Sequence, residues 1–295
     1  MNAQPLRARR VRFDLSRSPL HWIPHDPFAS YLMNAIHLLL PAGEFWFCRV
    51  YNRALPEVTD PVLRADVQGF VRQEAIHARS HEDAIDHYLR RHGIEVDSVV
   101  RVAHFVFGRL LEEKPVGKGF LARRLKKLQL RQQLAIIAAI EHYTCVLGKW
   151  VLEADALDAP NVDPVLRDLF RWHGAEEVEH RNVAHDLHAH LGGTTIERQA
   201  WAVAAFPALL ALLTYSGMQL MKQDPAVGTR GFFWRWKQAA HRGTLPTLES
   251  LFGAAVRYLD PRYHPEGEAS LDIALRYFAQ SPAVLAALAA ERAAA

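Results

Sequence analysis

The chain has 295 residues, half of them hydrophobic, and a formal net charge of +3, which allows one large domain or a domain with an appendage. The small charge does not indicate nucleic-acid binding, the two cysteines do not indicate a disulfide framework, and zinc-finger spacings, phosphate-binding glycine loops and dinucleotide fingerprints are absent from the sequence. The arginine-rich start lacks the apolar stretch of a secretory signal, so we expect a cytoplasmic protein.

Long runs with apolar residues at helical spacing, bounded by Pro, Gly and Asp, predict an all-α fold. The first helix is expected over residues 27–53, with a kink at Pro41, because proline removes a backbone hydrogen bond. The second helix is expected to begin at the cap formed by Asp60 and Pro61, and to end near residue 91. These two helices would form an antiparallel hairpin.

A second hairpin is expected after a long connection. The pattern predicts an amphipathic helix at 97–113, a third bundle helix at 120–155 and a fourth at 164–191. The stretch between the second and third helices is long enough for the crossover of a ferritin-like four-helix bundle. We therefore expect such a bundle over residues 20–192.

Residues 193–295 are expected to form a helical extension packed on this bundle. Residues 199–221 carry no charge, and this run is just long enough to cross a hydrocarbon core of about 30 Å. Aromatic and basic residues follow at 230–237, a composition enriched at membrane interfaces. Two interpretations remain open: a buried helix or homodimer interface, and membrane association through residues 199–237. Further helices are expected at 244–259 and 268–292.

Two Glu-x-x-His motifs and two lone glutamates mark the apolar helices. Positions i and i+3 lie on one face of a helix, so each motif can direct a carboxylate and an imidazole at one point. The order Glu, Glu-x-x-His, Glu, Glu-x-x-His is the ligand set of a carboxylate-bridged dimetal site in a four-helix bundle. The expected metal ligands are Glu44, Glu74, His77, Glu141, Glu177 and His180.

The chemistry of this set favours two divalent cations. Four carboxylates balance the charge of two such ions, whereas six buried ionisable groups without metal would be costly. We expect Glu44 and Glu141 to supply the bridging carboxylates. Carboxylate-rich sites with one histidine for each metal suit iron, with manganese or a mixed Mn/Fe pair as the alternative.

Other polar residues occur near the expected ligands. Three histidines and two cysteines are expected to surround the site without ligating metal, the histidines by hydrogen bonding to ligand carboxylates: His81, His142, His173, Cys48 and Cys145. Each cysteine follows its glutamate by four residues and should lie one turn along the same face. Glu176 offers an alternative register at position i−4 from His180, but Glu177 matches the spacing of the first motif.

This order of ligands resembles the ferritin-like dimetal superfamily. The stretches PAGEFWF, RQEAIHARSHEDAIDHY and WHGAEEVEHRNVAHDL are similar to a bacterial family labelled "predicted metal-dependent hydrolase". The resemblance covers residues 15–280 and implies metal binding and catalysis.

Three functions are compatible with the sequence. The leading expectation is O2-dependent oxidation of a hydrophobic small molecule, because apolar residues surround the ligands; an unidentified electron donor would then be required. The alternative is a metal-dependent hydrolase that uses a metal-bound water. The third is iron binding, iron storage or a structural role.

Overall fold

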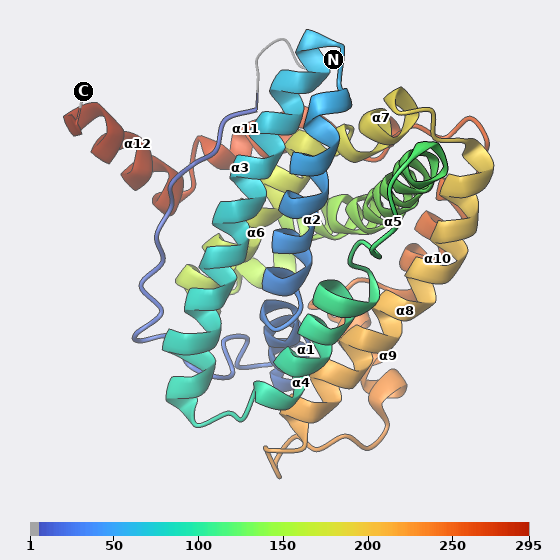
Figure 1. The fold of residues 1–295 in the computed structure, drawn as a ribbon. Helices are drawn as coiled ribbons and strands as arrows, with labels where there is room; N and C mark the ends of the chain where they lie inside the picture. The colour runs from blue at the N-terminus through green and yellow to red at the C-terminus, as the bar shows by residue number, and fades with distance from the viewer. Residues whose placement is uncertain (1–5, 295) are drawn as a thin grey trace.

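The computed structural model describes residues 6–294, and its regular elements are helices (Figure 1). The all-α prediction is confirmed. The α-helices are α1 (Pro27–His37), α2 (Leu40–Ala54), α3 (Pro61–Ala84), α4 (Asp97–Phe105), α5 (Phe120–Glu153), α6 (Pro164–His180), α7 (Val183–His190), α8 (Thr195–Met221), α9 (Phe232–His241), α10 (Leu248–Tyr258), α11 (Leu271–Phe278) and α12 (Pro282–Ala294).

Two hairpins form the centre of the molecule: α2 packs on α3, and α5 packs on α6. The starts of α3 and α6 are the predicted ones. The carboxylates of Asp60 and Asp163 each accept hydrogen bonds from two backbone amides of the first turn, and a proline follows each cap. The crossover between α3 and α5 contains α4, which continues into a π-helical turn at Val106–Leu110.

Two of the predicted bundle helices are divided in the structure. The helix expected over residues 27–53 is separated into α1 and α2 by a turn at residues 38–39. Pro41 explains the break, since it lacks the amide that a continuous helix would bond to His37. The fourth helix is interrupted at Arg181, whose guanidinium turns back to donate to the carbonyl of Val178, and it resumes as α7.

The backbones of α5 and α6 touch. A Cβ atom added to Gly148 would lie 2.5 Å from the carbonyl oxygen of Gly174, and one added to Gly174 would lie 2.8 Å from Cα of Gly148. Only glycine permits this approach at either position. The contact fixes the spacing of the helices that carry the second half of the site.

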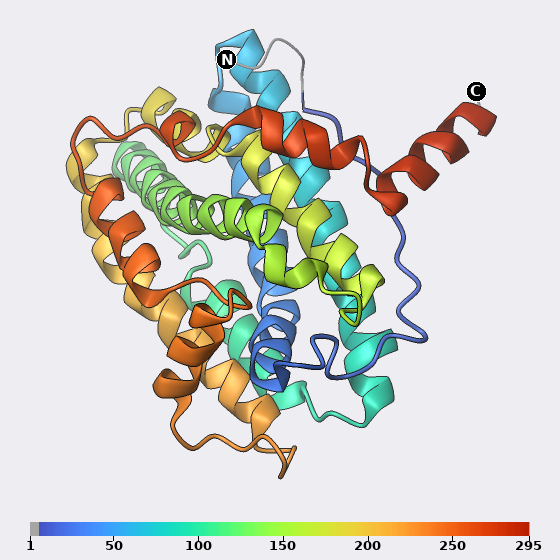
Figure 2. The same cartoon turned by 180° about the vertical axis from the view of Figure 1, so that it is seen from behind.

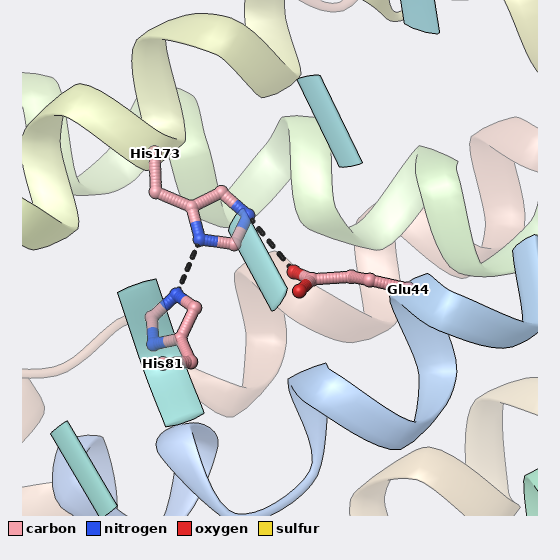
Figure 3. A group of neighbouring side chains, drawn as sticks. All are labelled: Glu44, His81 and His173. Atoms are coloured by element: carbon pink, nitrogen blue, oxygen red, sulfur yellow. Dashed lines mark hydrogen bonds and ion pairs between the residues drawn. The ribbon is translucent and has the colours of Figure 1, made fainter. Parts of the chain in front are cut away.

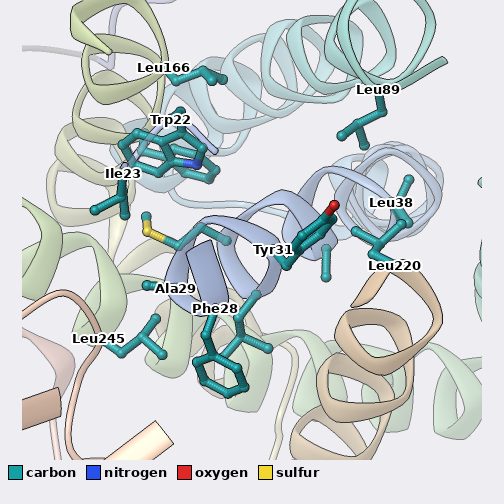
Figure 4. Packing of buried hydrophobic residues seen from close by; sticks show 14 of the residues in the cluster. Trp22, Ile23, Phe28, Ala29, Tyr31, Leu38, Leu89, Leu166, Leu220 and Leu245 are labelled. Atoms are coloured by element: carbon teal, nitrogen blue, oxygen red, sulfur yellow. The ribbon is translucent and has the colours of Figure 1, made fainter. Parts of the chain in front are cut away.

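The largest hydrophobic core surrounds α1, which is buried along almost its whole length (Figure 4). Trp22 stacks on Phe170 of α6, with ring centroids 5.5 Å apart, and Phe28 packs edge-to-face on Phe232 of α9. α1 therefore joins the bundle to the C-terminal extension.

The extension is packed along the bundle. α8 begins at a capping box formed by Thr194 and Glu197, and it lies against α1 and α5. The helix expected at 268–292 is divided into α11 and α12, because Pro282 starts a new helix capped by Ser281. The Asp168 carboxylate of α6 accepts hydrogen bonds from this junction and anchors it.

Candidate metal centre

Four helices bring the six expected ligands together. The lone glutamates lie on α2 and α5, and the two Glu-x-x-His motifs lie on α3 and α6. Every one of these side chains is buried, with at most 3 % of its surface exposed: Glu44, Glu74, His77, Glu141, Glu177 and His180.

Their donor atoms form two groups that share one carboxylate. Glu74 belongs to one group with Glu44 and His77, and to a second with Glu141 and His180; within each group the potential ligand atoms lie within 4.8 Å of one another. Glu177 lies beside both, since its two oxygens are 3.6 Å from His77 Nδ1 and 3.2 Å from His180 Nε2. The arrangement offers donor atoms at two neighbouring positions.

The bridging role expected of Glu44 and Glu141 stays a prediction, and the structure places two other glutamates closer to both imidazoles. Glu74 is shared by the two groups of expected ligands, and Glu177 lies between the two imidazoles, whereas Glu44 also forms a group with His81 and His173. The reason is the position of the helices: α3 and α6 each supply the histidine of one group, so their glutamates lie between the groups.

The donor set fits cations. Both oxygens of Glu44, Glu74 and Glu141 are buried, and among the described residues none of them accepts a hydrogen bond. Burial, followed by the neighbouring carboxylate of Glu177, raises the pKa of Glu141 to about 8, and burial also raises the pKa values of Glu44 and Glu74. Buried carboxylates in this arrangement need compensating positive charge, which two metal ions would supply.

Glu176 and an N-terminal arginine hold His77. The Nε2 atom of His77 is 2.9 Å from a Glu176 oxygen, so its N–H donates there and Nδ1 faces Glu74 at 3.4 Å. Arg9 donates to the same carboxylate at 2.8 Å. His77, followed by Arg9, lowers the pKa of Glu176 against the effect of burial. Glu176 therefore supports a ligand instead of replacing Glu177. The segment before α1 gave no sequence signal for this role of Arg9.

Gln73 orients the second imidazole. Its side-chain oxygen lies 3.1 Å from His180 Nδ1, so the ring donates to it and leaves Nε2 facing Glu141 at 3.2 Å. The amide nitrogen of Gln73 donates to Glu179 at 2.7 Å. The two histidines thus present different nitrogens to the centre, Nδ1 for His77 and Nε2 for His180.

Three buried histidines extend from the ligands toward α1. His173 Nε2 lies 2.8 Å from Glu177 and 3.5 Å from Glu44, and its Nδ1 lies 2.7 Å from His81 Nε2 (Figure 3). His81 Nδ1 in turn lies 2.6 Å from His37 Nδ1. Burial lowers the pKa of His37 to about 3 and that of His173 to about 4, so the rings are neutral. If His173 donates to Glu177, the other tautomers follow: His81 donates to His173, and His37 donates to His81.

These contacts show which of the histidines expected around the site contact a ligand carboxylate. His173 bonds to a ligand carboxylate, whereas His81 reaches one only through His173. The expectation for His142 is wrong: its side chain turns away from the ligands and bonds to Tyr263 and to the carbonyl of Ala254. Adjacent helical residues point about 100° apart, so the residue after Glu141 cannot share its face.

Neither cysteine forms part of the donor set. Cys48 is half-buried and donates to the carbonyl of Val71, and burial together with Glu74 raises its thiol pKa to about 12. Cys145 packs in the cluster with Trp172 and Val178, and burial raises its pKa as well. Both thiols are therefore protonated packing groups.

An apolar pocket of about 220 Å³ opens onto the donor set. Four of the ligand carboxylates and His173 line its floor: Glu44, Glu74, Glu141 and Glu177. The remaining lining is almost entirely apolar and comes from α1, α2, α5, α6 and α8 together with the chain around Trp236 and Leu251. A substrate in this pocket would reach the metal ligands through hydrocarbon surroundings.

The fold and the donor set define a helical metal-binding protein. A family model described as "Predicted metal-dependent hydrolase" matches residues 7–269, and the chain belongs to this family. The match contains all six proposed ligands, and it confirms the family resemblance found in the sequence. Searches of the curated proteins and of the solved structures gave no match.

Proposed function

We propose that the protein is an enzyme with a dinuclear metal centre that acts on a hydrophobic small molecule held in the pocket. The observation that carries the proposal is the position of four buried carboxylates at the floor of an otherwise apolar pocket, three of which accept no hydrogen bond from the described residues. Glu44, Glu74 and His77 would hold one ion, and Glu74, Glu141 and His180 the other, with Glu177 beside both.

For the reaction, the family description favours hydrolysis over the oxidation expected from the sequence. We therefore infer a metal-dependent hydrolase for an ester or amide of an apolar molecule. When bound, the metals would supply an activated water and polarise the carbonyl. The protein's own residues would exclude bulk water and orient the apolar chain, while His173 holds Glu177 in place through its Nε2–H.

The donor set supports O2-dependent oxidation as a second candidate. Four carboxylates and only two imidazoles around two ions suit iron or manganese, and this charge balance makes bound ions weak Lewis acids. The pocket also offers few polar groups to a polar substrate. Oxidation would need an electron donor from outside this chain.

Metal substitution separates the two reactions. Protein loaded with Zn²⁺ or Mn²⁺ should hydrolyse p-nitrophenyl esters of long acyl chains in the absence of O2, and the Glu44→Gln/Glu141→Gln variant should not. Hydrolysis is the wrong reaction if no metal supports it while anaerobic Fe²⁺-loaded protein consumes O2 and changes its optical spectrum in air. If the protein retains no metal under any condition, the dinuclear proposal itself is wrong.

A further inference from the structure

α8 is apolar on both of its faces. Its inner face lines the pocket with Phe206, Leu209, Leu210 and Leu213. Its outer face is exposed and carries no charged side chain over about four turns, at Ala200, Val203, Ala204, Pro207, Ala208, Ala211 and Tyr215. Of its most apolar 18-residue window, 22 % is buried, compared with 67 % for the corresponding window of α5. A water-exposed helix normally carries polar residues on its outer face.

Large exposed side chains continue this surface on neighbouring helices. α8, α9 and α10 lie on the same side of the molecule in both views (Figures 1 and 2). Phe233 and Trp234 of α9 are 55 % and 65 % exposed, and Phe252 and Val256 of α10 are 64 % and 54 % exposed. We call the outer face of α8 with these four residues the apolar flank. An exposed apolar area of this extent indicates an interaction site.

Basic segments adjoin both ends of the apolar flank. Residues 225–248 contain no acidic residue, and the exposed Arg230 and Lys237 are found there beside the aromatic pair of α9. Beyond the other end of α8, residues 114–140 contain seven Lys and Arg residues and no acidic residue. Within the part of the chain that the structure describes, no carboxylate pairs with Lys118, Arg123 or Lys126.

The start of α5 combines these charges with exposed apolar residues. Leu121, Leu125 and Leu128, at helical spacing, are 68 %, 40 % and 44 % exposed. This end of α5 is joined to the start of α8, since Trp201 donates to Gln132 and Arg131 pairs with Glu197. Apolar side chains flanked by unpaired Lys and Arg are the composition of helices that lie in the interface of an anionic membrane.

We propose that the apolar flank docks on the surface of an anionic phospholipid bilayer, with the basic segments contacting lipid headgroups. α8 then separates the hydrocarbon of the bilayer from the apolar pocket, which explains why both of its faces are apolar. If the proposed function is correct, the substrate class is an acyl-chain compound taken from the membrane. Pro207 interrupts the backbone hydrogen bonding of α8 beside the pocket-lining Phe206, where the wall could open.

Two other positions for α8 fit the structure less well. A membrane-spanning α8 would have to leave α1, although Ser216, Gly217 and Leu220 are buried and a Cβ on Gly217 would meet Leu32 at 2.9 Å. A second copy of the chain on the apolar flank would bring basic segments together in either orientation, because both ends of α8 adjoin them. Headgroup phosphates provide the opposite charge.

Vesicle flotation tests the docking without any assay of activity. The wild-type protein should float with phosphatidylcholine vesicles that contain phosphatidylglycerol, and much less with phosphatidylcholine alone. Ala204→Glu/Ala208→Glu places charge on the outer face of α8 at exposed positions, and Lys118→Glu/Arg123→Glu/Lys126→Glu reverses the basic segment. Each variant should lose at least about tenfold in binding, since each basic residue near an anionic surface contributes about 1 kcal/mol. Arg72→Glu/Arg79→Glu is the matched control and should bind as wild type, because both residues are exposed on α3, a helix on the other side of the molecule from α8 (Figure 1).

The outcomes separate docking from the proposed function. The Glu44→Gln/Glu141→Gln variant should still float if the docking is correct, even though it should bind less metal. The docking proposal fails if wild-type protein does not float with anionic vesicles, or if the α8 variant floats as well as wild type. It also fails if size-exclusion chromatography shows a dimer that the α8 variant dissociates while no vesicles are bound. A protein that floats but has no metal-dependent activity would contradict the proposed function alone.

Discussion

The centre of the bundle and the apolar flank depart from the usual distribution of residues in opposite ways. The centre buries four carboxylates and several imidazoles, where an apolar core is expected, whereas the flank exposes an uncharged helix face and aromatic side chains, where polar residues are expected. Each departure is unfavourable in free energy for the isolated chain in water. Each therefore points to a partner of complementary chemistry: cations for the centre and lipid for the flank.

The strongest test of this comparison is the shared carboxylate. Glu74→Gln removes one anionic oxygen donor from both ligand groups, so the affinity for both metals should fall by more than about 100-fold, since the loss of even a supporting partner costs about 10–100-fold. Metal analysis after dialysis measures the loss. Glu44→Gln is the control and should affect one metal more than the other. Retention of two metals by Glu74→Gln would contradict the shared position.

The next test uses the raised pKa of a buried carboxyl group. Glu141 has a pKa of about 8 in the metal-free fold instead of the ordinary 4.5. The folded state therefore keeps a proton that the unfolded state has released, and metal-free stability should fall as pH rises from about 4.5 to about 8, by on the order of a few kcal/mol. His180 acts in the same direction, since nearby Glu177 and Glu141 raise its pKa against the effect of burial.

Bound metal ions would remove this loss of stability at higher pH, because they replace the protons on the buried ligand groups. The difference in Tm between metal-loaded and metal-free protein should thus widen between about pH 5 and pH 8. Thermal unfolding followed by circular dichroism at several pH values gives this difference. A difference that narrows as pH rises would show that the centre does not compensate charge in this way.

A smaller effect is expected where the interior is closely packed. Gly148→Ala places a methyl group against the carbonyl of Gly174, so the free energy of unfolding should fall by about 1–3 kcal/mol. Gly108→Ala, in a helical turn with open space around it, is the matched control and should change stability by less than about 1 kcal/mol, toward stabilisation. Denaturant unfolding measures both, and equal effects would contradict the contact.

The smallest effect is expected on the apolar flank itself. Ala204→Glu should change the free energy of unfolding in solution by no more than about 0.5 kcal/mol, because the side chain is exposed. The same denaturant titration measures it. Leu209→Glu, one helical turn away but facing the pocket, should destabilise the protein strongly. Similar costs at the two positions would remove the distinction between the faces of α8.

The sequence predicted the parts of the fold that depend on local patterns. The caps at Asp60 and Asp163 mark where α3 and α6 begin, and helical spacing relates Glu74 to His77. In a four-helix bundle, glutamates and histidines on the apolar helix faces must point to the common centre, so it could be inferred that they meet there. The break at Pro41 was predicted only as a kink, because its extent depends on how α1 packs.

Other features depend on contacts between distant segments. Arg9 reaches Glu176 across 167 positions of sequence, and His37 reaches His81 across 44, without any motif to mark either contact. The choice between Glu176 and Glu177 as ligand, and the shared role of Glu74, depend on rotation of whole helices. The outward direction of His142 could have been predicted, since it follows directly from the position of Glu141.

The glycine contact between α5 and α6 also determines how the centre can respond mechanically. Because the two backbones already touch at Gly148 and Gly174, this pair of helices is a stiff wall that cannot approach further. The helix that carries Glu44 instead follows a turn at residues 38–39 and has a proline in its first turn. If the proposed centre binds two ions, we therefore expect a change in their spacing to move α2 and Glu44 more than α5 and α6.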